Sequence, residues 1–552
     1  MTSGTSRLHP AARRHAREVA RGQLGRREFL TRVTALGASV PAAYGLLGIT
    51  APRAETPARR EGGRLRIQQD VRSLKDPRTY DWPQIANYTR GWLEYLVEYN
   101  RDGSIHGMLL ESWEVDDDAE GYTLHVRPGV TWNDGSAFTA RDVAWNFERW
   151  CDRSVEGNSM ASRLPGLIDP DSGRARDGAI EVVDDLTLRL NLSSPDISII
   201  ATCSDYTAAI VKDGHGGDDL LADPVGTGPY LPGDYEVGVR GVLLRNHDHD
   251  WWGTDLFGAP TLEQIEFIDL GTDQSAIVAA VDAGEVDMTY ETVGDFIDLL
   301  DILMERSETV TARTMVIRPN QQAEVNGMRP YADVRVRRAL AMAVDNEVLL
   351  ELGYDDRGVV AENHHVCPIH PEYAELPEPP VFDPEGARQL MEEAGMADFT
   401  HELISIDDSW RRPTADAAAA MLRDAGIPVE RTVLPGATFW NDWANYPFSS
   451  TDWGHRPLGV QSLALAYRSG EPWNETGFEN AEFDALLGEA LRIADADERR
   501  EVMARIQRLL QEEGVMIQPY WTSVFRHHRP DVVGAEAHPA FEIYPYKLGF
   551  AA

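Results

Sequence analysis

The segment Asn363–His370 (NHHVCPIH) concentrates side chains that can ligate a metal ion. Three imidazoles and one thiol occur in it, and these groups are good protein ligands for Ni, Cu and Zn. They belong to His364, His365, Cys367 and His370. No acidic second shell is evident beside them, so two further interpretations stay open. Asn363, His364 and His365 make polar contacts with a bound solute, or the segment is an ordinary loop.

An aromatic group follows at Phe439, Trp440, Trp443 and Tyr446, with Trp453 nearby. Trp440 and Trp443 lie three residues apart and would share one face of a helix. Aromatic residues at this spacing are more often part of a core. In a binding site they would instead stack on a sugar, a peptide side chain or another flat solute.

The run Phe448–Gly459 (FSSTDWGHRPLG) places Arg456 close to Asp452 and Trp453. A guanidinium is a planar fork of donors that pairs bidentately with carboxylate or phosphate. Arg456 is therefore a candidate contact for an anionic or hydroxyl-rich solute. The alternative is a structural pair between Arg456 and Asp452. Gln69, just after the first predicted strand, is a candidate contact from another part of the chain.

Sequence signatures of enzymes are missing. The chain contains no HExxH, GxSxG, GxxxxGK[ST] or GxGxxG motif. Gly226-Thr227-Gly228 could be mistaken for a phosphate loop, but Pro229-Tyr230 continues into a predicted strand and not into a helix. We therefore expect a binding protein and not an enzyme.

The stretch Gly121–Arg149 (GYTLHVRPGVTWNDGSAFTARDVAWNFER) predicts a rigid unit of two strands and a helix. Tyr122–Arg127 alternates like a strand with one buried face, and a Pro-Gly turn ends it. Val130–Trp132 is a second short strand before an Asn-Asp-Gly turn. Thr139 then caps a helix whose apolar residues share one face.

This stretch closely resembles the signature of the peptide/nickel-binding (family 5) solute-binding proteins of ABC importers. Seven other segments resemble motifs of the same family, and they follow in the same order from residue 111 to residue 486. They are ESWE at Glu111, VDDLTLRL at Val183, PVGTGPY at Pro224, AGEVD at Ala283, RPYADVRVRRALAMAVD at Arg329, the helix Asp383–Gly395 and the helix Asn480–Leu486.

The resemblance implies an α/β, two-lobed periplasmic binding protein fold of the large cluster C type, with a hinge between the lobes. Lobe I would contain residues 63–316 and 521–552, with a small subdomain at about 100–230, and lobe II residues 317–520. The sequence marks both crossings independently, by a polar break at Ile317–Gly327 and a short apolar strand at Val515–Tyr520. The length of 552 residues also exceeds the roughly 250–300 residues that one core supports.

The same resemblance implies a function. The chain would capture a small solute in the cleft between the lobes and deliver it to the permease and ATPase subunits of an ABC importer, acting as a monomer without a cofactor. In peptide-binding relatives an Asp of the segment similar to Phe448–Gly459 grips the free α-amine of the peptide, and Arg456 takes the corresponding position here. This change favours an anionic or hydroxyl-rich solute, although a peptide-like solute held by another anchor stays open. The alternatives are a metal-chelate or haem binder of this family, a periplasmic metal-assisted hydrolase, and a chaperone-like module.

The N-terminal residues predict the cellular location of the protein. Gly25–Thr31 (GRREFLT) precedes an apolar run at Val33–Ile49, which is the pattern of a twin-arginine export signal, here taken as residues 1–54. The cleavage site is open, with candidates at Ala51, Ala54 and Ala58. We expect a periplasmic protein that is exported already folded.

Charge and cysteine content agree with this location. The net charge is −38, although the first 60 residues carry 11 Arg against 3 Glu, so the remainder is strongly acidic. Such a surface repels nucleic acid and anionic membranes. Cys151 and Cys203 could pair in an oxidising periplasm, but buried free thiols are the favoured interpretation for all three cysteines.

Overall fold

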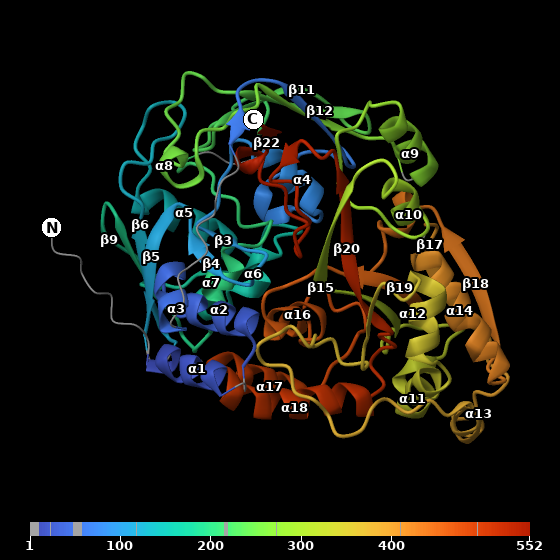
Figure 1. Ribbon diagram of the computed structural model, residues 1–552. Helices are drawn as coiled ribbons and strands as arrows, with labels where there is room; N and C mark the ends of the chain where they lie inside the picture. Colours follow the sequence, from blue (N-terminus) through green and yellow to red (C-terminus); the bar gives the residue numbers. More distant parts are fainter. Residues whose placement is uncertain are drawn as a thin grey trace. The chain divides into compact units, whose positions relative to one another are not determined.

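The computed structural model describes residues 10–21, 24–47, 58–116, 119–214, 219–271, 273–408, 410–493 and 495–552 (Figure 1). The chain forms two compact units. Unit 1 comprises Met1–Thr309, Arg492–Ala494 and Val524–Ala552, and unit 2 comprises Val310–Leu491 and Asp495–Ser523. The main crossings lie inside two long strands, β15 (Glu305–Pro319) and β20 (Tyr520–His528). The sequence placed them at residues 316–317 and 520–521, within the same two strands.

The larger sheet of unit 1 has the order β11, β12, β13, β2, β14 and the end of β20. Strand β2 pairs in parallel with β13 on one side and with β14 on the other, and the other pairs of this sheet are antiparallel. The strands are β11 (Tyr230–Glu236), β12 (Arg240–Arg245), β13 (Gln264–Ile268), β2 (Arg64–Gln68) and β14 (Met288–Thr289). The predicted turn before Tyr230 is confirmed, and it needs glycine because a Cβ on Gly226 would stand 2.0 Å from the carbonyl oxygen of Trp92.

A four-stranded antiparallel sheet of unit 1 contains the predicted strand Tyr122–Arg127 as β6 (Gly121–Val126), and the predicted helix follows as α5 (Ala140–Trp150). The order of the sheet is β5 (Leu110–Val115), β6, β10 (Thr187–Asn191) and β9 (Ile180–Asp184). Helix α5 begins after Thr139, whose backbone N–H donates to Asp142 Oδ2 at 2.8 Å. The prediction of a strand at Val130–Trp132 is wrong, because only Thr131 pairs there, in an isolated bridge to Ala137.

Shorter elements complete unit 1. Two small sheets join β3 (Val97–Tyr99) to β4 (Ile105–Gly107) and β7 (Ile168–Asp169) to β8 (Arg174–Ala175), and a third joins β1 (Arg59–Arg60), β22 (Gly549–Ala551) and β21 (Val532–Val533). The helices are η1 (Pro77–Thr79), α4 (Pro83–Thr89), α6 (Met160–Arg163), η2 (Pro165–Leu167), α7 (Ile199–Thr202), α8 (Thr254–Phe257), α9 (Gln274–Asp282), α10 (Phe296–Leu300) and η4 (Pro545–Lys547).

The sheet of unit 2 continues in the order β20, β15, β19 (Phe448–Trp453), β17 (His401–Ile406) and β18 (Val429–Leu434), with β16 (Gly358–Val360) on β20. Helix α14 (Arg411–Asp424) connects the parallel strands β17 and β18. The other helices are η3 (Pro330–Ala332), α11 (Val334–Met342), α12 (Asn346–Tyr354), α13 (Pro384–Glu393), α15 (Gly436–Phe439), α16 (Gly459–Ala466), α17 (Ala481–Arg492) and α18 (Ala496–Glu512). The helices predicted from Asp383 and Asn480 are confirmed as α13 and α17, and the segment that begins at Arg329 forms η3 and α11.

The predicted export segment forms three helices, α1 (Pro10–Ala20), α2 (Arg26–Ala35) and α3 (Val40–Leu46). The candidate cleavage positions Ala51 and Ala54 lie outside the described residues. Among the described helices, none is long and apolar enough to cross a membrane. Cys151, Cys203 and Cys367 are buried thiols that form no disulfide with one another, and burial raises the pKa of both Cys151 and Cys203 to about 12.

Candidate functional site

The predicted site residues of unit 2 gather around strand β19 and the turn that follows it. Asp452 lies opposite Met315 of β15 in the antiparallel pair. Arg313, two residues before Met315, extends from the same face of the sheet as Asp452, because side chains alternate along a strand. Strand register therefore brings a cation to Asp452 from far away in the sequence.

Two arginines hold the Asp452 carboxylate. Arg313 Nε donates to Oδ2 at 3.1 Å, and Arg411 Nε donates to Oδ1 at 2.8 Å. Both guanidinium carbons lie 4.6 Å from the centre of the Trp410 ring, within cation–π range. Burial alone would raise the pKa of Asp452, but the two arginines outweigh it and the pKa is lowered. Asp452 is thus a compensated carboxylate.

Four tryptophans form an edge-to-face cluster beside this network. Trp453 lies 5.9 Å from Trp473 and 6.4 Å from Trp443 between ring centres, and Trp443 lies 6.4 Å from Trp440. Trp453 is buried, whereas the other three are half-buried. Trp440 and Trp443 also pack against the small apolar cluster of Phe439, so the core interpretation holds for part of their surface. Their remaining surface is accessible to a solute.

A buried ion pair supports the tryptophan cluster. Glu475 accepts from Arg318 Nε at 2.9 Å and from the indole nitrogen of Trp453 at 2.7 Å. Arg318 is fully buried and also donates to the backbone carbonyls of Trp443 and Tyr446. The pair therefore fixes one ring of the cluster and the backbone that carries another.

The histidines of the segment Asn363–His370 are buried and already hydrogen-bonded. His364 Nε2 lies 3.0 Å from Glu362, and His370 Nε2 donates to the carbonyl of Arg456 at 3.2 Å. His365 Nδ1 lies 2.7 Å from the hydroxyl of Tyr467. Burial lowers the pKa of His365 to about 3, assisted by neighbouring positive charge, so its ring is neutral at ordinary pH.

Gln518 ties this loop to the crossing strands of unit 2. Its side-chain oxygen accepts from the backbone N–H groups of His364 and His365, and its side-chain nitrogen donates to Thr314 of β15. Its own backbone N–H donates to Asn363 Oδ1 at 2.7 Å. Asn363 and His365 have φ angles of 59° and 55°, a left-handed conformation that non-glycine residues rarely adopt. Such local strain is characteristic of ligand-binding segments.

Arg456 and Gln69 are both buried. Arg456 is 8% exposed, and its Nη1 donates to the carbonyl of His455 at 3.0 Å. In unit 1, the Gln69 side chain donates to the carbonyl of Gln84 at 3.1 Å and accepts from Asn87. The polar atoms of Gln69 are therefore used within its own unit.

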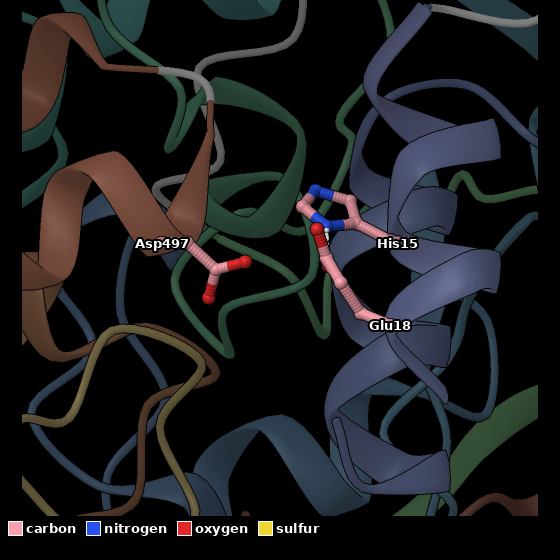
Figure 2. A group of neighbouring side chains, drawn as sticks. All are labelled: His15, Glu18 and Asp497. Carbon is pink, nitrogen blue, oxygen red and sulfur yellow. Dashed lines mark hydrogen bonds and ion pairs between the residues drawn. The ribbon is translucent and has the colours of Figure 1, made fainter. Parts of the chain in front are cut away.

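Potential metal ligands are drawn in Figure 2. His15 and Glu18 lie one turn apart on α1, with His15 Nδ1 2.8 Å from Glu18 Oε2. Asp497 belongs to unit 2, in the first turn of α18, where it accepts from Arg500 at 2.6 Å. Within either unit by itself, the described residues contain no group of three His, Cys, Asp or Glu side chains whose ligand atoms lie close enough together to hold a metal ion. The segment Asn363–His370 is included in this statement.

Several residues that contact the predicted site residues were not identified from the sequence. Trp410 and Arg411 had a local signal, because this aromatic and basic pair follows the acidic pair Asp407-Asp408 after a single residue. Arg313, Glu475 and Gln518 had none, because each meets its partners through contacts between distant segments.

Comparisons with known proteins agree in one direction. The profile of "Bacterial extracellular solute-binding proteins, family 5 Middle" matches residues 104–475. The chain is 26% identical over 486 residues to "Heme-binding protein A" of Haemophilus influenzae, covering 80% of this chain and 83% of that protein. It is 27% identical over 421 residues to the "Dipeptide-binding protein" of Escherichia coli, covering 71% and 68%. The structure of the Escherichia coli murein tripeptide binding protein MppA superposes with a TM-score of 0.79 at 20% identity, covering 90% of this chain and all of that one. The fold is therefore that of the two-lobed periplasmic binding proteins.

Proposed function

The chain belongs to family 5 of the bacterial extracellular solute-binding proteins, and from this premise we propose that it captures a peptide-like or other small polar solute for an ABC importer. The observation that carries the proposal is the family match over residues 104–475, which includes parts of both units. The receiving partners would be the permease and ATPase subunits. Binding and delivery need no chemical step, so no catalytic residue is assigned.

The charge distribution of unit 2 supports an anionic solute over one gripped by its amine. Asp452 is the nearest carboxylate in sequence to Arg456, and Arg313 and Arg411 already neutralise it. Asp408 also pairs with Arg411, so both carboxylates are already engaged by arginines and neither is a ready anchor for a positively charged α-amine. A carboxylate or phosphate would instead be attracted by Arg456.

We propose that the solute contacts both the predicted arginine and the predicted aromatic residues of unit 2. Arg456 would supply a charge-assisted donor, and the half-buried faces of Trp440 and Trp443 would stack on a flat or apolar part of the solute. The remaining candidates are Asp452, Trp453, Asn363, His364 and His365 of unit 2 and Gln69 of unit 1. Apart from the half-buried Asp452, these remaining candidates are buried, and they would act chiefly by holding Arg456, Trp440 and Trp443 in place.

Native mass spectrometry of the purified protein, searching for a co-purified solute, tests the proposal directly. A thermal-shift panel then compares di- and tripeptides, their N-acetylated forms, and small dicarboxylates. A ligand at a hundredfold excess over Kd stabilises the folded state by about 2.7 kcal/mol. Binding that survives N-acetylation supports the anionic anchor, and a strict requirement for the free amine refutes it.

Haem is a second candidate because a haem-binding protein is among the relatives with the highest identity. The tryptophan cluster offers flat apolar surface, and arginines would pair with the propionates. His364 and His365 are buried and hydrogen-bonded, so axial ligation through them would require the loop to rearrange. A titration that follows the Soret band decides this: a red-shifted, saturable band supports haem, and no spectral change removes it.

We propose further that the protein is exported to the periplasm by the twin-arginine route and acts there as a monomer. The paired arginines Arg26 and Arg27 followed by Phe29 and Leu30 support the route. Light scattering of the purified protein, with and without solute, tests the monomer.

A further inference from the structure

The N-terminal helices α2 and α3 pack against one edge of unit 1 (Figure 1). We call residues 26–46 the leader. The surface that receives it is the outer edge of the two-stranded hairpin β3–β4, with Asp102 in its turn and Trp113 on the neighbouring strand β5. We call this surface the hairpin edge. Strand β4 pairs with a strand on one side only, so its other side presents backbone groups that need partners.

Two threonines of α2 satisfy the backbone groups of the hairpin edge. The Thr31 hydroxyl donates to the carbonyl of Gly103 at 2.5 Å, and Thr34 Oγ1 accepts from the N–H of Ile105 at 2.8 Å. Both bonds are buried. The helix therefore offers a donor to the carbonyl of Gly103 and an acceptor to the N–H of Ile105, from two side chains that lie about one helical turn apart.

Glycine at position 103 makes this approach possible. Its φ angle is +87°, and a Cβ there would stand 2.6 Å from Thr31 Oγ1 and 2.7 Å from Arg27 Cγ. No side chain larger than hydrogen fits between the helix and the turn without displacing one of them.

Contacts on both sides extend the interface. The indole nitrogen of Trp113 donates to the carbonyl of Ala35 at 3.3 Å, and the Tyr44 hydroxyl donates to Asp102 at 2.9 Å. Ile197 of unit 1 packs in one buried cluster with Leu36 of the leader. Together with a bond from Arg27 to the hydroxyl of Tyr99, the interface thus combines five hydrogen bonds with apolar burial, which is more than incidental contact of a loose segment supplies.

Docking holds the export motif in a fixed state. Phe29 and Leu30, the apolar pair that follows the two arginines, are fully buried among the helices α1, α2 and α3 themselves. Because both α2 and α3 are hydrogen-bonded to the hairpin edge, docking keeps this helix packing closed. Arg26 lies over the ring of Tyr44 at 4.8 Å, and Arg27 donates to the hydroxyl of Tyr99 at 3.4 Å. A receptor that reads this motif needs access to the side chains of Phe29 and Leu30.

We propose that the hairpin edge of unit 1 is a docking site for the chain's own leader, and that docking slows export until the leader detaches. The docking site rests on the contacts alone, and the effect on export rests additionally on the proposed twin-arginine route. Release of the leader would free α2 and α3 from the hairpin edge, so that the helix packing that buries the motif can open, and it would leave the edge of β4 to solvent.

The first experiment measures docking by hydrogen exchange on the purified full-length protein. Gly103→Ala places a methyl group against Thr31, so the exchange of the Ile105 amide should accelerate about tenfold or more, because its buried acceptor moves away. Gly129→Ala is the matched control, since Gly129 also has a positive φ, +80°, but a methyl group at that position would meet no atom within 4 Å. Ile105 exchange that is equal in both variants and the wild type overturns the docking site, and so does free exchange of the leader amides in the wild type.

The second experiment follows processing of the precursor in cells by pulse-chase. Gly103→Ala should mature at least about twice as fast as Gly129→Ala, because a detached leader is read at once. Loss of Ile105 protection with an unchanged maturation rate overturns the brake. Normal export of the double variant Arg26→Lys and Arg27→Lys would instead refute the twin-arginine route, which leaves the exchange result unaffected.

Discussion

Removing Glu475 should destabilise unit 2 substantially. Its carboxylate is 2% exposed at the side chain, and its partner Arg318 is fully buried. Glu475→Ala leaves the Arg318 charge without its counter-ion and deletes the acceptor for Trp453 and for Thr451, whose hydroxyl donates at 2.6 Å. Removing one partner of a buried pair costs about 3–5 kcal/mol. Arg318 keeps two carbonyl acceptors, from Trp443 and Tyr446, so we expect the lower end of that range, about 3 kcal/mol.

The assay must report on unit 2 alone, because a chain with two units need not unfold in one step. Native-state hydrogen exchange of the β19 peptide Phe448–Trp453 gives the free energy of opening of that strand. Glu475→Gln removes the charge but keeps an oxygen acceptor for Trp453, so it separates the ionic part from the hydrogen bonds. Glu392→Ala is the control, since Glu392 forms an exposed pair with Arg388 and should change stability by about 0.5 kcal/mol or less. A Glu475→Ala effect as small as the control would refute the supporting role of the pair.

Three further predictions concern the solute, pH and export. Arg456→Ala should weaken solute binding at least about tenfold with a nearly unchanged apo melting temperature, measured by calorimetry and thermal shift; unchanged affinity would remove Arg456 from the site. Burial lowers the pKa of His401 from 6.5 to about 4, so the unfolded state binds more protons than the folded state between these values and stability falls as pH drops through them, by up to about 3 kcal/mol. His401→Phe should flatten this dependence in denaturant midpoints taken from pH 7 to pH 4, and an equally steep variant would contradict the assignment. Replacing Arg26 and Arg27 by Lys should leave the precursor in the cytoplasm, as judged by cell fractionation, because lysine keeps the charge but not the planar guanidinium.

Local signals predicted much of the fold. The helix after Thr139 and the strand Tyr122–Arg127 could be predicted from sequence. A helix cap, a turn and an apolar face each depend on residues that are close together in the sequence. The strand predicted at Val130–Trp132 failed for the complementary reason. A strand needs a partner, and the only pairing at Thr131 is a single bridge. The residue types of so short a segment do not show whether a neighbouring strand pairs with it along its length.

The candidate site was predictable only in part, because its charges are paired across long sequence separations. Asp452 was weighed against Arg456, four residues away. The geometry gives it Arg313 and Arg411 as partners, which strand register and the start of α14 bring to it. Trp440 and Trp443 do contact one another, but the prediction that they share one face of a helix is wrong, because α15 ends at Phe439. Their support by Glu475 depends on a loop whose position no local pattern specifies.

The acidic surface and the arginines of unit 2 have different ranges of action. A net charge of −38 repels an anion at long distance, but salt screens that repulsion beyond about 8 Å at physiological ionic strength. Inside a partly desolvated site the screening is weak, so individual guanidinium groups dominate. Asp452 and Asp408 balance the charges of Arg313 and Arg411, and Glu475 balances that of Arg318. Selectivity for an anionic solute would therefore depend on Arg456, while the acidic exterior repels anionic membranes.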